Sequence, residues 1–203
     1  MAEKLKTFTY TDLLVQLCNS VTSVLTTATG KKITYSPVVQ STTKTMLTPD
    51  IGTFAMFTGA FAGMAIINFP KETAMDLYSS YMSNMGIPEN EQAKNYTSEE
   101  VSNSLGELMN QILGNYTRLV SDELHSVIQQ SQPKMLSVPR ELQLSINVNL
   151  DNPKCSKVSF FTENKNVFYL EIAMDNVRFQ AIREFDEDTA EESPEDLLKQ
   201  LNI

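Results

Sequence analysis

The chain contains stretches in which apolar residues recur at helical spacing and others in which they occupy every second position. Helical spacing predicts helices over residues 9–29, 70–85 and 98–130. A threonine, Thr9 or Thr11, can cap the first helix, and Gly30 follows its end. The run from Thr97 to Glu100 resembles a capping signature for the third and longest helix.

Strands are predicted where apolar and polar residues alternate. The clearest alternation covers residues 142–150, with apolar side chains at Leu142, Leu144, Ile146, Val148 and Leu150. Residues 32–40 favour an extended segment, and residues 158–162 and 167–174 favour a hairpin. This order of elements predicts an α/β protein of the α+β kind, a two-layer sandwich of mostly antiparallel strands packed against long helices.

Residues 51–69 carry no charge, and this run is nearly as long as the roughly 20 residues of a membrane-spanning helix. Glycines at 52, 59 and 63 interrupt it, and its residues alternate in the manner of a buried strand. We therefore favour two strands joined by a turn at residues 59–61 over a membrane span, and expect no membrane association.

The length of 203 residues favours one domain, which we expect over residues 1–182. From Glu184 the chain is strongly acidic, so residues 183–203 are predicted to be a peripheral or partly disordered tail. The 16 basic and 25 acidic residues give a net charge of −9, and there is no basic cluster. Nucleic acid is therefore not an expected partner.

Cysteine and histidine are scarce. Cys18 and Cys155 are far apart and His125 is the single histidine, which excludes a site made of several histidines. Two isolated thiols suit packing in a reducing compartment. The N-terminal residues lack the apolar run of a secretory signal, so the expected location is the cytoplasm.

The most informative stretch runs from Asn103 to Asn110 on the third predicted helix. At roughly 100° per residue, one side of this helix carries Leu105, Leu108, Met109, Ile112, Tyr116 and Leu119. The other side gathers Asn103, Glu107, Asn110 and Gly114 within roughly 60°. An acid and an amide that do not pack inward can act on something outside, although they can also be only the solvated face of an amphipathic helix.

This helix resembles the active-site helix of the CheX/CheC/FliY family of bacterial chemotaxis phosphatases. That family carries Asp or Ser, then Glu four residues on, Asn three further on, and Pro after 22 more. Glu107 and Asn110 have this spacing, and Pro133 follows Asn110 after 22 intervening residues. The likeness continues through Gly114, but Asn103 stands where the family has Asp or Ser. The motif occurs once here, as in the CheX branch.

The resemblance implies a CheX-like fold and removal of the aspartyl phosphate from a CheY-type response regulator. It implies that Asn110 orients the attacking water and that Glu107 pairs with the regulator's active-site lysine. Mg²⁺ would belong to the regulator, so the resemblance implies no metal or other cofactor of this chain's own. It also implies a homodimer.

Two other interpretations of the function remain open. A protein of the same fold can dock a regulator or a flagellar or chemotaxis component without hydrolysis, and Asn103 supports this reading. Alternatively, a structural or ligand-binding protein can carry the motif by coincidence. In that case we expect Glu107 and Asn110 to be buried or bonded internally.

Overall fold

The computed structural model describes residues 7–150 and 152–180. Residues 9–177 form one compact unit. Strands β1 (Thr7–Thr9) and β11 (Arg178–Gln180) pair with each other in a separate two-stranded sheet. The acidic tail at residues 183–203 and the domain boundary at residue 182 lie outside the described residues, so both stay predictions.

A seven-stranded sheet forms the centre of the compact unit. Its strands follow the order β2-β9-β10-β5-β4-β6, and β7 also pairs with β4. Every pairing within it is antiparallel. The strands are β2 (Thr34–Thr42), β4 (Ile51–Gly59), β5 (Gly63–Phe69), β6 (Ile128–Gln130), β7 (Lys134–Ser137), β9 (Lys154–Phe161) and β10 (Val167–Met174).

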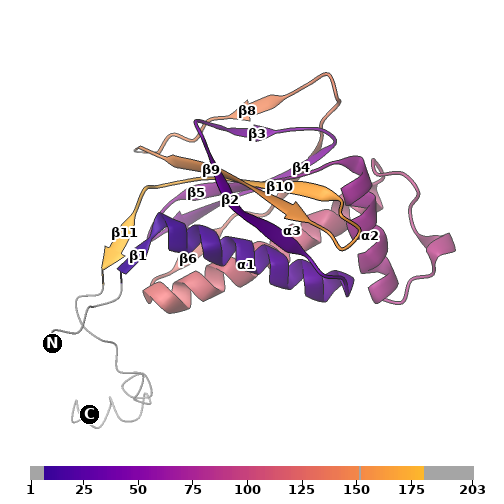
Figure 1. Ribbon diagram of the computed structural model, residues 1–203, viewed down its shortest axis with the longest axis horizontal. Helices are drawn as coiled ribbons and strands as arrows, with labels where there is room; N and C mark the ends of the chain where they lie inside the picture. The colour runs from indigo at the N-terminus through magenta and orange to yellow at the C-terminus, as the bar shows by residue number, and fades with distance from the viewer. Residues whose placement is uncertain (1–6, 151, 181–203) are drawn as a thin grey trace, which may run out of the picture. The chain divides into compact units, whose positions relative to one another are not determined.

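Helices α1 (Tyr10–Thr29) and α3 (Glu99–Leu124) cover one face of this sheet, and α2 (Lys71–Asn84) packs against both (Figure 1). A short 3₁₀ helix, η1 (Glu89–Glu91), lies in the connection from α2 to α3. Aromatic rings fill the space between the layers: Phe57 meets Tyr116 of α3 edge to face, with 5.9 Å between ring centroids. The predicted α+β sandwich is therefore confirmed.

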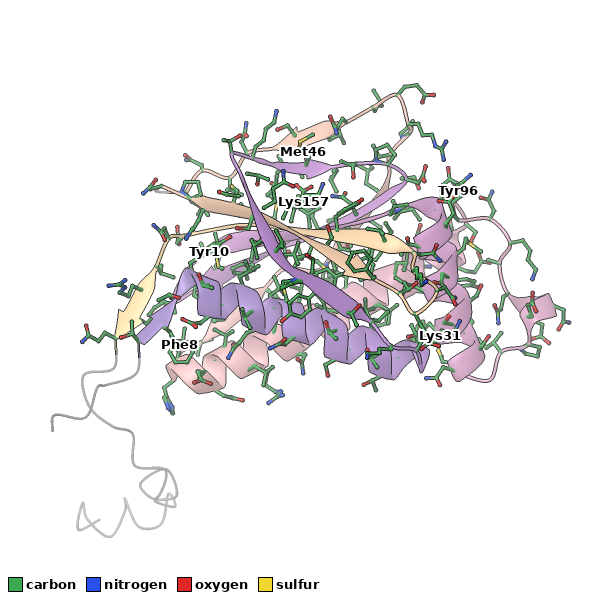
Figure 2. The ribbon with its side chains drawn as sticks, in the orientation of Figure 1. Phe8, Tyr10, Lys31, Met46, Tyr96 and Lys157 are labelled. Atoms are coloured by element: carbon green, nitrogen blue, oxygen red, sulfur yellow. The ribbon has the colours of Figure 1, made fainter. Side chains whose placement is uncertain are left out.

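A small sheet of β3 (Thr45–Leu47) and β8 (Leu144–Ile146) lies over the opposite face (Figure 1). It covers an apolar cluster of Leu47, Met64, Ile66 and Val138. The buried carboxylate of Glu171 fixes it in place: this group accepts the backbone N–H of Met46 at 2.8 Å and pairs with Lys157 at 3.3 Å. Figure 2 labels both partners. Sequence periodicity predicted the two main layers but not the small sheet of β3 and β8.

Most predicted elements are present. The helix at 9–29 begins at Tyr10, where Asp12 accepts the N–H of Thr9 at 2.8 Å, and it ends before Gly30 in a left-handed conformation (φ 66°). The uncharged run at 51–69 forms the antiparallel hairpin of β4 and β5. Within the described ranges, no helix has the length and apolar character to cross a membrane.

Two predicted bounds are wrong. The helix expected over 98–130 ends at Leu124, His125 turns in a left-handed conformation (φ 45°), and residues 128–130 return as β6. The long-range pairing of β6 with β4 replaces the last predicted turns. The strand expected over 142–150 has only three paired residues, because its partner β3 is equally short.

Both cysteines are buried and unbridged. Desolvation by burial raises the pKa of Cys18 to about 12, so it stays a thiol at neutral pH. This fits the packing role that the sequence indicated.

Candidate functional site

Helix α3 separates its faces as the periodicity predicted. Leu105, Leu108, Met109, Ile112 and Tyr116 are buried, and Leu119 is half-buried. Asn103, Glu107 and Asn110 are exposed on the other face. The N-cap is Ser98, whose side chain accepts the N–H of Val101, while Glu99 and Glu100 complement the positive helix end. The apolar face holds the helix on the sheet and leaves the acid and the amide accessible.

The Glu107 carboxylate accepts one hydrogen bond from the described residues, from the side chain of Gln111. The Nε2 of Gln111 donates to Oε1 of Glu107 at 3.1 Å, one helical turn further on. None of the ion pairs in the described ranges involves Glu107. The carboxylate can therefore accept a cation from another molecule.

The Asn110 side chain is held by a residue from outside the helix. The Nε2 of Gln130, in β6, donates to Oδ1 of Asn110 at 3.2 Å. The hydroxyl of Thr117 lies 3.4 Å from Oε1 of Gln130. Sequence reasoning missed Gln130 because it placed residue 130 on the same helix as Asn110, where the two side chains would not meet.

The strand segment after α3 runs back along the exposed face. Gly106 faces this segment, because a Cβ at this position would meet Cγ of Met135 at 3.4 Å. Pro133 lies between β6 and β7, where pairing to β4 is interrupted. Gly114 is half-buried, and apart from its chain neighbours and the helix's own backbone a Cβ there would meet no atom within 4 Å.

The structure thus brings Glu107 and Asn110 onto one exposed face of α3 and lays the Gln130–Met135 segment beside it. No hydrogen bond joins the Asn103 side chain to another described residue. No group of three or more His, Cys, Asp or Glu in the described ranges could hold a metal ion.

The two motif side chains, Glu107 and Asn110, lie on an exposed face of α3. A pocket between α1, α2 and α3 is lined by Gln111 and Asn115 of α3 but by neither Glu107 nor Asn110. Sites for small molecules are concave and bury most of the ligand. An exposed amide and acid on a helix surface instead suit contact with a protein. Each side chain has one internal hydrogen bond, as the interpretation of a coincidental motif allows, but neither is buried. Nδ2 of Asn110 and Oε2 of Glu107 remain available.

Three comparisons place the chain among known proteins. The sequence model of a family described as "Protein of unknown function (DUF3334)" matches residues 4–202. Among curated proteins, none matches this sequence.

Solved structures of similar fold include several chemotaxis proteins. CheX from Desulfovibrio desulfuricans has a TM-score of 0.65 and 16% identity, covering 81% of this chain and 99% of that chain. CheX from Borrelia burgdorferi, solved in a complex with CheY, BeF3 and Mg²⁺, has a TM-score of 0.58 and 17% identity, covering 80% and 97%. FliY from Thermotoga maritima has a TM-score of 0.54 and 19% identity, covering 76% and 83%. These likenesses confirm the CheX/CheC/FliY fold.

Proposed function

The chain belongs to the DUF3334 family and has the CheX fold, and on this basis we propose that it is a phosphatase of a CheY-type response regulator. The observation that carries the proposal is the shared exposure of Glu107 and Asn110 on α3, at the spacing of the CheX/CheC/FliY motif. The complex of the Borrelia burgdorferi protein with CheY supports a CheY-type receiver domain as the partner.

An aspartyl phosphate is an activated acyl phosphate, and its hydrolysis passes through a loose transition state. The catalyst mainly positions water and stabilises charge, without forming a covalent bond. The side-chain amide of Asn110 can enter the receiver's active site and orient the attacking water. Mg²⁺, held by the receiver, supplies charge neutralisation at the phosphoryl oxygens.

Glu107 lies one turn before Asn110 and has no cationic partner in the described part of the chain. In the proposed complex its carboxylate pairs with the receiver's active-site lysine. This pairing fixes the register of the two proteins and draws the lysine away from the phosphoryl group. Its strength falls with ionic strength, as expected of a pair at an interface.

The proposal is tested by release of inorganic phosphate from CheY-type receiver domains of the same organism. Each receiver is phosphorylated with acetyl phosphate in the presence of Mg²⁺. We expect the chain to accelerate phosphate release, and Asn110→Ala to lower kcat on the order of 10²–10³-fold because a positioning amide is lost. Glu107→Ala should mainly raise KM.

Matched controls use the same residue types elsewhere. Asp122→Ala removes an exposed acid from the same helix, and Gln129→Ala removes an exposed amide from β6. Both should retain wild-type rates. Wild-type protein that accelerates no receiver, or Asn110→Ala and Glu107→Ala proteins as fast as wild type, would refute the phosphatase.

Asn103 supports a second function, docking without hydrolysis, because it replaces the Asp or Ser of the motif. In that case the chain binds a beryllofluoride-loaded receiver but does not accelerate phosphate release from the phosphorylated one. Asn103→Asp and Asn103→Ser test the position: a gain in kcat in either variant would show that Asn103 limits turnover.

Two broader expectations belong to the same proposal. Response regulators act in the cytoplasm, so cell fractionation should find the chain there. Homodimerisation is tested by the molar mass of the full chain in sedimentation equilibrium, with and without the receiver.

A further inference from the structure

The contact between Gln130 and Asn110 adds a residue to the candidate site. Resting on the proposed function, we propose that Gln130 is a positioning residue that fixes the orientation of the Asn110 amide. Gln130 acts through Asn110 and does not itself touch the phosphoryl group.

The geometry defines which edge of the Asn110 amide faces the partner. Gln130 Nε2 donates to Oδ1 of Asn110 at 3.2 Å, so Oδ1 is directed toward β6. The amide is planar, so Nδ2 then points away from β6, toward the exposed side of α3. Since no other side chain donates to Asn110 within the described ranges, Gln130 alone defines this orientation.

Gln130 can hold Asn110 because its own position is constrained. It pairs with Phe57 in the register of β6 on β4. The next residue, Ser131, is bonded twice to Met56: its N–H donates to the Met56 carbonyl at 2.8 Å, and its hydroxyl accepts the Met56 N–H at 3.0 Å. On the other side, Thr117 of α3 lies 3.4 Å from Oε1 of Gln130. The glutamine therefore connects the sheet edge to two turns of α3.

An amide held in one orientation should accelerate the reaction more than an amide that rotates freely. An unrestrained asparagine presents either its N–H₂ or its carbonyl oxygen, and only one of these matches a given arrangement of water and phosphoryl oxygen. Fixing the amide before the receiver arrives removes the reorganisation that would otherwise accompany the transition state. With Oδ1 held by Gln130, Asn110 is presented as a hydrogen-bond donor.

Substitutions at position 130 separate orientation from packing. Gln130→Glu keeps the size but reverses the polarity: a carboxylate cannot donate to Oδ1, and it accepts from Nδ2 instead. We expect kcat on phosphorylated receiver to fall on the order of 10²-fold. Gln130→Ala releases the amide without reversing it, and we expect a fall of about 10-fold. In both variants KM should stay at the wild-type value, because Glu107 is untouched.

A second readout requires no substrate. The side-chain amide resonances of Asn110, assigned by comparison with Asn110→Ala, report its hydrogen bonding in ¹⁵N–¹H spectra of the full chain. Gln130→Glu should move one Asn110 side-chain proton downfield as Nδ2 becomes a donor to the new carboxylate. Asn110 resonances identical in wild type, Gln130→Ala and Gln130→Glu would overturn the proposal.

The two readouts keep this inference distinct from the proposed function. Wild-type protein without turnover would refute the phosphatase, while the spectra would still decide whether Gln130 orients Asn110. An active wild type with unchanged kcat in Gln130→Glu would refute the positioning role alone. The controls Gln129→Glu and Gln129→Ala change the exposed neighbouring glutamine and should alter neither readout.

Discussion

The carboxylate of Asp76 joins segments that are far apart in the sequence. Its oxygens accept from Thr162 at 2.7 Å, Asn164 at 2.8 Å and Asn166 at 2.9 Å, and Lys31 lies 3.8 Å away. Lys31 follows the end of α1 (Figure 2). One side chain on α2 thus fixes the turn between β9 and β10. Burial alone would raise the pKa of Asp76, but these hydrogen bonds and the lysine charge lower it below its usual value.

Asp76→Asn should lower the free energy of unfolding at neutral pH by about 1–3 kcal/mol, because charge-assisted hydrogen bonds are lost. The folded-state pKa lies below the unfolded value of about 3.9, so the contribution is fully present above that value. It is lost as the pH falls through the folded-state pKa. Urea denaturation at a series of pH values should therefore show the two proteins converging in acid. A constant difference would contradict this role.

A substitution at Gly114 should affect folding stability and receiver binding in opposite directions. Because a Cβ at this helical position would meet nothing beyond its own helix backbone within 4 Å, Gly114→Ala should stabilise the chain by about 0.5–1 kcal/mol. Thermal unfolding measures this gain. If a receiver approaches this face closely, the same variant should have a higher KM, and a stabilised protein with unchanged KM would place Gly114 outside the interface.

Among the secondary-structure elements, the end of α3 shows what the sequence could and could not predict. The exposure of Glu107 and Asn110 followed from helical periodicity, which is a local property. The turn at His125 did not, because neither Gly nor Pro marks it and because β6 forms only by pairing with the distant β4. The contact between Gln130 and Asn110 depends on that turn, so this contact could not be predicted from the sequence.

The small sheet of β3 and β8 depends on a buried asparagine. Oδ1 of Asn68 accepts the N–H of Thr48 at 2.9 Å, and its Nδ2 donates to the carbonyl of Met46 at 2.9 Å. Asn68→Ala leaves both backbone groups unpaired and should cost about 2–4 kcal/mol. Amide hydrogen exchange should accelerate in β3 and β8 more than in β5.

The matched control for this test is Asn84→Ala, which removes an asparagine bonded to the exposed end of α1. It should leave exchange in β3 unchanged. If Asn68→Ala accelerates amide hydrogen exchange equally in β3 and β5, the whole chain unfolds more readily, and the small sheet is not detached selectively.

For the whole molecule, the sandwich was predictable because alternating and helical patterns each report one buried face. The small sheet of β3 and β8 over the other face of the central sheet was not predictable. It pairs β3 with a strand about 100 residues later, and the alternation at 142–150 gave no sign that only three residues would pair. Long-range partners set the length of such strands more than their own composition does.

The chain and its proposed partner should differ in their need for metal. In the described ranges no side-chain cluster is suited to a metal ion, so EDTA should leave the unfolding temperature of the chain unchanged within about 1 °C. The same EDTA should stop phosphate release from the mixture with receiver, because the receiver holds Mg²⁺. A marked fall in the unfolding temperature would reveal a structural metal.

Asn103 through Met135 forms one uninterrupted stretch in which α3, its left-handed cap and the returning strand follow directly on one another. The amide of Asn110 and the glutamine proposed to orient it therefore lie within one continuous segment of the chain. Because β6 is held by β4, this segment keeps the Gln130–Asn110 contact only in a scaffold that also supplies the β4 edge.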